Sequence, residues 1–201
     1  LDERGGIGNL ATRFGQGLAL LGGHDACQVL LVRQDQLVPA AQQRGALDEV
    51  MVIASALSVQ DVRDRPMDKQ TQADQAHAKF DDEKSEFSGT LKLWKWLDDT
   101  KGGHGKDHKL SHRQYETLLR ENFINVRRVR EWRDIHTQLH TVVAEHKWIL
   151  NTQPASYEQL HLAMLSGLLG NIGQKNEAED WYLGARGIKF YRHPGANLSK
   201  K

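Results

Sequence analysis

Apolar side chains recur at three- and four-residue intervals along most of this chain, a spacing that is typical of amphipathic helices. The clearest run covers residues 47–57, where apolar positions lie almost all the way around the helix, so we expect this helix to be central. A weaker run covers residues 26–43 and predicts a helix that is broken or bent at Pro39. The pattern predicts a mainly helical fold.

Helix-start signals divide the rest of the chain into further helices. Ser85 is placed to cap a helix that begins beside it. Ser111 and Ser156 are each followed three residues later by a glutamine, which predicts a capping box at the start of two more helices. Residues 61–66 are predicted to form an exposed charged loop, and residues 67–80 a polar helix on the surface. Residues 100–109 are predicted to form a flexible connector.

A long helix that begins near Asn122 carries four arginines and a tryptophan within a short stretch. At about 100° per residue, two of the arginines point away from the apolar stripe and are placed to form ion pairs one turn along, Arg127 with Glu131 and Arg130 with Asp134. Arg128 lies on the apolar side. A guanidinium there must stack, pair or reach a ligand, because a bare buried charge costs several kcal/mol. Contact with RNA or with an interdomain carboxylate, and stacking on Trp132, remain open from the sequence.

The pattern changes after residue 176. Residues 182–192 predict two short strands around Gly187. A lone hairpin is marginally stable in water, so we expect these strands to need partners that the chain does not contain.

Composition limits the class of protein. The 201 residues, 39% hydrophobic and 26% charged, can form one or two domains with a substantial core. The net charge of +1 means that any nucleic-acid contact depends on a local basic patch. Cys27 is the only cysteine, which excludes an internal disulfide and fits a reducing cytoplasm. We expect no membrane span, and we expect the chain to be a fragment, because Leu1–Arg4 is neither an initiator methionine nor a signal peptide.

Motifs for the common catalytic classes are missing from the sequence. It contains no Walker A loop, G-x-S-x-G, H-E-x-x-H or C-x-x-C, and we name no catalytic residue. His104, His108 and His112 have a spacing that could chelate zinc on a helix, but the glycines among them favour a loop, and we expect no metal site. His136 and His161 lie on apolar stripes, where a core histidine is favoured over a catalytic one.

Five groups of residues stand in a characteristic order. They are VIASALSVQDVRDRP at 52–66, residues 73–94 with SEF and LW, residues 123–139, residues 160–173, and YLGAR through HPG at 182–195. Together they resemble the helicase-associated region of bacterial DEAH-box RNA helicases. In that family two RecA-like motor domains are followed by a winged helix, a helical ratchet-like domain and an OB-fold. The resemblance implies a divergent winged-helix-like segment at 1–45, the ratchet-like domain at 46–175 and the first strands of a truncated OB-fold at 176–201.

The resemblance also implies a function. The chain would be the C-terminal accessory part of an ATP-dependent 3′–5′ RNA helicase, guiding single-stranded RNA and coupling it to a RecA-like motor. ATP and Mg²⁺ would bind the motor domains and not this chain, which alone should be inactive. Its partners would be RNA, the upstream RecA-like domains and the rest of the OB-fold, and we expect a monomer. The alternative is a stand-alone RNA- or protein-binding helical module.

An RNA-guiding wall needs cations for phosphates and aromatic rings for bases. The candidate RNA-binding residues are Arg128, Arg130, Trp132, Arg133, Lys189 and Arg192. Trp94, Trp96 and Trp132 are more typical of core anchors than of base-stacking platforms.

Overall fold

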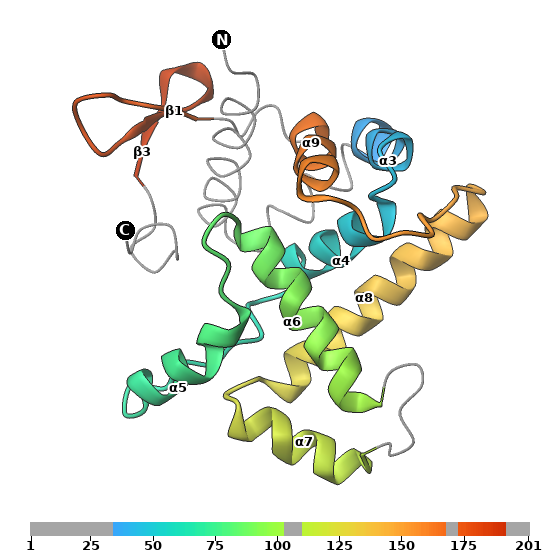
Figure 1. Cartoon of the computed structure of the whole chain (residues 1–201), viewed down its shortest axis with the longest axis vertical. Helices are drawn as coiled ribbons and strands as arrows, with labels where there is room; N and C mark the ends of the chain where they lie inside the picture. The colour runs from blue at the N-terminus through green and yellow to red at the C-terminus, as the bar shows by residue number, and fades with distance from the viewer. Residues whose placement is uncertain (1–33, 103–109, 168–172, 192–201) are drawn as a thin grey trace.

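The computed structural model describes residues 34–102, 110–167 and 173–191 (Figure 1). These residues form seven α-helices and a small antiparallel sheet, which confirms the mainly helical fold. The helices are α3 (Gln34–Gln43), α4 (Leu47–Leu57), α5 (Gln70–His77), α6 (Glu86–Lys101), α7 (His112–Glu121), α8 (Val126–Glu145) and α9 (Tyr157–Gly167), with a 3-10 turn η1 at Ala78–Phe80. None of the described helices is long and apolar enough to cross a membrane.

Helix α4 is the central element, as its all-round apolar pattern predicts. Seven of its residues are buried. One side of α4 packs with α3 and α9, together with Phe87 and Val143. The other side contributes Val52 to a second core that α6, α7 and α8 complete around Trp132. Figure 1 shows α3 and α9 side by side in the upper part of the view and α7 at the bottom, with α6 and α8 running between these two levels.

Helix α3 continues through Pro39, so a break at that residue is wrong. Proline removes one intrahelical hydrogen bond, but Leu37 and Ala41 on either side of it are buried in the core shared with α9. This tertiary packing keeps the turn helical. The earlier part of the predicted helix, residues 26–33, and most of the winged-helix-like segment lie outside the described residues.

The three predicted helix starts are confirmed. Ser85 Oγ accepts hydrogen bonds from the backbone N–H groups of Phe87 and Ser88. Ser111 and Gln114 form a complete capping box. Ser156 does the same at α9, where its hydroxyl accepts from the Gln159 N–H at 3.2 Å and its own N–H donates to the Gln159 side chain at 2.8 Å. The predicted end of this last helix at Gly173 stays untested, because residues 168–172 before it lie outside the described part of the chain.

Helix α8 begins at Val126, four residues later than the pattern predicts, with Asn125 as its N-cap. Phe123 has a positive φ of 54° and turns the chain between α7 and α8. The loop at 61–66 pairs with this turn: the Asn125 N–H donates to Val62 O at 2.7 Å and the Asp64 N–H donates to Phe123 O at 2.8 Å. The loop is therefore charged but not fully exposed, since Val62 is buried.

The C-terminal part forms a three-stranded antiparallel sheet in the order β1 (Gln174–Lys175), β2 (Tyr182–Leu183) and β3 (Lys189–Phe190). The turn between β2 and β3 contains η3 (Ala185–Gly187), with Gly187 at φ 76°. The two predicted strands thus have a partner within the chain, β1, contrary to the expectation that their partners would be missing. The rings of Tyr182 and Phe190 stack at 5.5 Å across β2 and β3.

Candidate functional site

The four arginines of α8 reach four different acidic side chains. Arg127 pairs with Glu131 one turn along the same helix, with Nε to Oε1 at 3.1 Å, as the spacing predicts. This pair is solvent-exposed, so it contributes only a few tenths of a kcal/mol. The other three arginines leave their own helix and join α8 to neighbouring elements.

Arg128 connects α8 to the loop at 61–66. Its Nη1 donates to Asp64 Oδ1 and to the backbone oxygen of Asp61, both at 2.9 Å. The second carboxylate oxygen of Asp64 accepts from the Asn125 side chain at 3.0 Å. The Arg128 side chain is only 24% exposed. Of the alternatives that the sequence leaves open, carboxylate pairing satisfies this guanidinium, and the partner belongs to the same helical unit.

Arg130 connects α8 to α7. Its guanidinium pairs with Glu116, and its Nη2 lies 3.3 Å from His112 Nε2. The predicted pairing of Arg130 with Asp134 is therefore wrong. The reason is the fold: α7 runs beside α8 and brings Glu116 closer than the acid one turn along. Glu116 also accepts from Arg120 at 3.2 Å, so two arginines share one carboxylate. The Arg130 side chain remains 58% exposed.

Trp132 and Arg133 face α6 and α4. The indole of Trp132 is 1% exposed, and its N–H donates to Ser55 Oγ at 3.0 Å and Val52 O at 3.2 Å. Arg133 lies over the Trp94 ring at 5.0 Å, with Nη2 2.8 Å from Asp98 Oδ1. Neither Nη2 nor Nε of Arg133 makes an aligned hydrogen bond. The Trp132 ring is therefore buried in the core and is not accessible for stacking on a base.

The remaining candidates lie in the sheet. Lys189 is exposed, and its Nζ lies 4.3 Å from the Trp181 ring centroid, a cation–π contact. Arg192 lies outside the described residues. Lys189 is thus far from the α8 arginines in sequence and belongs to a separate element.

A group that sequence reasoning did not assemble lies between α4 and α8. Asp48, His136 and His140 each place one potential ligand atom within 4.8 Å of the others. Burial lowers the pKa of His136 to about 4, and repulsion from His140 and Arg133 acts in the same direction. Burial and the neighbouring Glu49 raise the pKa of Asp48. The four-residue step from His136 to His140 was the one available signal.

Of the three histidines with zinc-ligand spacing, His112 is described, and it is not a member of this group. His104 and His108 lie outside the described residues. His112 pairs with Glu116 at 3.5 Å, which gives its imidazole a structural partner. The prediction for the three-histidine spacing therefore stays untested.

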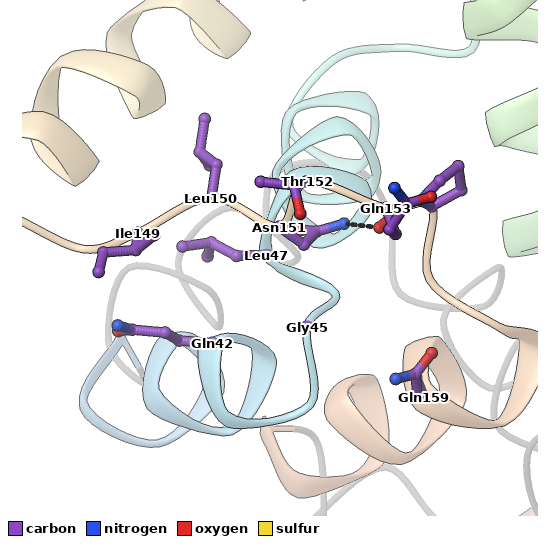
Figure 2. Close-up of a pocket in the computed structure, with 10 residues that line it drawn as sticks. Gln42, Gly45, Leu47, Ile149, Leu150, Asn151, Thr152, Gln153 and Gln159 are labelled. Atoms are coloured by element: carbon purple, nitrogen blue, oxygen red, sulfur yellow. Dashed lines mark hydrogen bonds between the residues drawn. The ribbon is translucent and has the colours of Figure 1, made fainter.

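A cavity of about 490 Å³ opens beside the start of α4 (Figure 2). Its lining is made of aliphatic, amide and small side chains, with no ionisable group: Gln42, Gly45, Leu47, residues 149–154 and Gln159. Asn151 Oδ1 accepts from the Asp48 N–H at 2.9 Å, supplying the cap that Ala46 cannot provide, while its Nδ2 donates to Gln153 O at 2.8 Å. Thr152 contributes a hydroxyl to the lining, but no histidine, carboxylate or lysine lines the cavity beside it to activate that hydroxyl as a nucleophile.

Comparison with known proteins gives a consistent result. No family model matches the chain. It is 43% identical over 170 residues to the ATP-dependent RNA helicase HrpA of Escherichia coli strain K12, a match that covers 84% of this chain and 12% of that protein. It is 36% identical over 201 residues to the HrpA homolog of Haemophilus influenzae, covering 100% of this chain and 14% of the relative.

Proposed function

Because the chain is homologous along its length to a segment of the bacterial HrpA-type ATP-dependent RNA helicases, we propose that it is an accessory region of such a helicase. In this proposal the region guides single-stranded RNA and couples it to a RecA-like motor elsewhere in the protein. The observation that carries the proposal is the match over all 201 residues to a relative of which the chain spans 14%.

The packing of α8 supports a role as a rigid wall. Arg128, Arg130 and Arg133 join α8 to the loop at 61–66, to α7 and to α6. Trp132 joins it to α4. In the proposal these contacts hold the wall in shape, so that Arg128, Trp132 and Arg133 act on RNA by positioning α8 and not by direct contact.

Direct RNA contact is assigned to the exposed cations. Arg130 keeps more than half of its side chain accessible, although one of its nitrogens pairs with Glu116. Lys189 beside Trp181 offers a cation and an aromatic face together. Phosphate neutralisation and base stacking hold a strand without reading its sequence, which suits translocation. Arg192 remains a candidate on the same grounds of residue type.

Two arginines that share one carboxylate provide a matched test. Arg130→Gln and Arg120→Gln each remove one exposed ion pair with Glu116. In the intact helicase, binding of a fluorescent single-stranded RNA is measured at several salt concentrations. We expect Arg130→Gln to weaken binding and to lower the slope of log affinity against log salt by about 1, since one phosphate contact is lost. Arg120→Gln should bind like the wild type. Equal behaviour of the two variants would exclude Arg130 as a contact.

A further inference from the structure

Three potential metal ligands converge where the first turn of α4 passes the middle of α8. His136 and His140 are one helical turn apart on α8, a spacing that places both imidazoles on one face of the helix. Asp48 comes from the first turn of α4. One ligand atom from each of the three lies within 4.8 Å of the other two.

A second observation points to a missing partner at this place. The Nε2 atom of His136 is buried and has no hydrogen-bond partner. Buried polar atoms are normally satisfied, and an exception calls for an ion or a water. The His136 ring lies between the ring of Trp94 at 4.6 Å and that of His140 at 4.7 Å, so its position is set by packing.

We propose that Asp48, His136 and His140 bind a divalent transition-metal ion of the zinc class. Two imidazole nitrogens and one carboxylate oxygen are ligands that zinc accepts, and three protein ligands leave a fourth position for water. Tetrahedral ligands at the usual zinc distances lie about 3.3 Å apart. The three atoms lie within 4.8 Å of one another, so each separation has to shorten by at most about 1.5 Å. Rotations of the Asp48 and His140 side chains, neither of which is buried, supply this movement while His136 stays in place.

The electrostatic surroundings permit a dication. Asp98 and Glu49 lie close enough to influence these ionisable groups and add negative charge, whereas Arg133 opposes it. A bound ion would connect the start of α4 to α8 at a point distinct from the Trp132 contact with Ser55. This inference does not depend on the proposed RNA function.

The test uses the 201-residue chain stripped with a chelator and titrated with Zn²⁺ alone. Calorimetry measures the affinity, Co²⁺ substitution reports the coordination by visible absorption, and thermal unfolding reports stabilisation. We expect one ion per chain, a raised unfolding midpoint and a tetrahedral Co²⁺ spectrum. Mutation of an outer-shell partner of a metal typically lowers the affinity by about 10- to 100-fold. Removal of a direct ligand should lower it more, so we expect His140→Ala and Asp48→Asn to weaken Zn²⁺ binding by about 100-fold or more.

His146→Ala is the matched control, because His146 is an exposed histidine at the end of the same helix. It should bind Zn²⁺ within about twofold of the wild type. Asp48 and His140 are chosen for substitution because neither is buried, and circular dichroism checks that each variant is folded. Absence of saturable binding overturns the proposal. Undiminished binding by both variants also overturns it and assigns the ion to other histidines, such as the group at 104–112.

Discussion

At the scale of single residues, Trp132 contributes to the fold through its indole N–H as well as through its ring. The ring packs 4.8 Å from Trp94 in the core between α6 and α8. The N–H donates to Ser55 Oγ, which itself donates to the carbonyl groups one turn back in α4. This buried hydrogen-bond network fixes the position of α8 on α4.

Trp132→Phe keeps most of the ring volume and removes the indole N–H. We expect it to lower the free energy of unfolding by about 1–3 kcal/mol, because Ser55 loses a buried donor and a small cavity forms. Urea unfolding measures the change. Trp148→Phe, at a partly buried site where the ring stacks on His146, should cost clearly less. Comparable losses in the two variants would show that the hydrogen bond contributes little.

The pH dependence of stability should reflect His161. Its Nδ1 lies 2.7 Å from Tyr157 O, which can only accept, so Nδ1 carries the proton and Nε2 accepts from Ser85 Oγ at 2.6 Å. Burial lowers the pKa of His161 below its ordinary value of 6.5, although the Tyr157 carbonyl and Asp82 act the other way. The unfolded chain therefore binds more protons below about pH 6.5.

It follows that this contribution to stability is complete above pH 6.5 and decreases as the pH falls below it. Urea unfolding at pH 7.5 and pH 5 measures the decrease. His161→Gln cannot titrate, so its decrease should be smaller than that of the wild type, with the remainder coming from groups such as His136. An identical decrease in both proteins would rule out the assignment to His161.

At the scale of elements, the helix caps differ in what else they touch. Ser111 caps α7 at the surface, whereas Ser85 caps α6 in the core and also donates to His161. We expect Ser111→Ala to cost about 1 kcal/mol, the usual value for a lost N-cap. Ser85→Ala should cost about 2–3 kcal/mol, because it also leaves a buried imidazole nitrogen without a donor. Thermal or urea unfolding of the two variants, side by side, checks the order; a reversed order would contradict it.

Elements that depend on nearby residues could be predicted, and contacts between distant residues could not. The bounds of α4 and the caps at Ser111 and Ser156 follow from local pattern and spacing. The start of α8 could not be placed, because Asn125 is fixed by pairing with Val62 across the chain. The partner of Arg128 is 64 residues away in sequence, and nothing local marks Asp64 as its acceptor. Asp48 was likewise missed beside His136, since it comes from a different helix.

At the scale of the whole molecule, the described residues form a helical unit with a sheet after it. The predicted boundary at residue 176 stays a prediction, and the first strand of the sheet lies just before it, at Gln174–Lys175. The winged-helix-like assignment of residues 1–45 and the continuation of the sheet into an OB-fold also remain predictions. The proposed role as an accessory region requires that these parts connect to a motor.

The 201-residue chain alone should hydrolyse no ATP. Phosphoryl transfer needs a phosphate-binding loop and a Mg²⁺ site, and the sequence contains no Walker A motif. Phosphate release is measured with and without single-stranded RNA, and the intact helicase serves as the positive control. RNA-stimulated hydrolysis by the chain would be incompatible with a separate motor.

The membership of α4 in two cores has a dynamic consequence. Local unfolding of this helix exposes apolar side chains on both of its sides, so its local unfolding has a high free energy. Its amide protons should exchange with solvent only when the entire unit unfolds, whereas α5, which buries only Ala73 and His77, can fray on its own. Packed interiors have low compressibility and transmit strain, so a force applied to the α3–α9 face is transmitted through α4 to α8. The helix is, in mechanical terms, a strut.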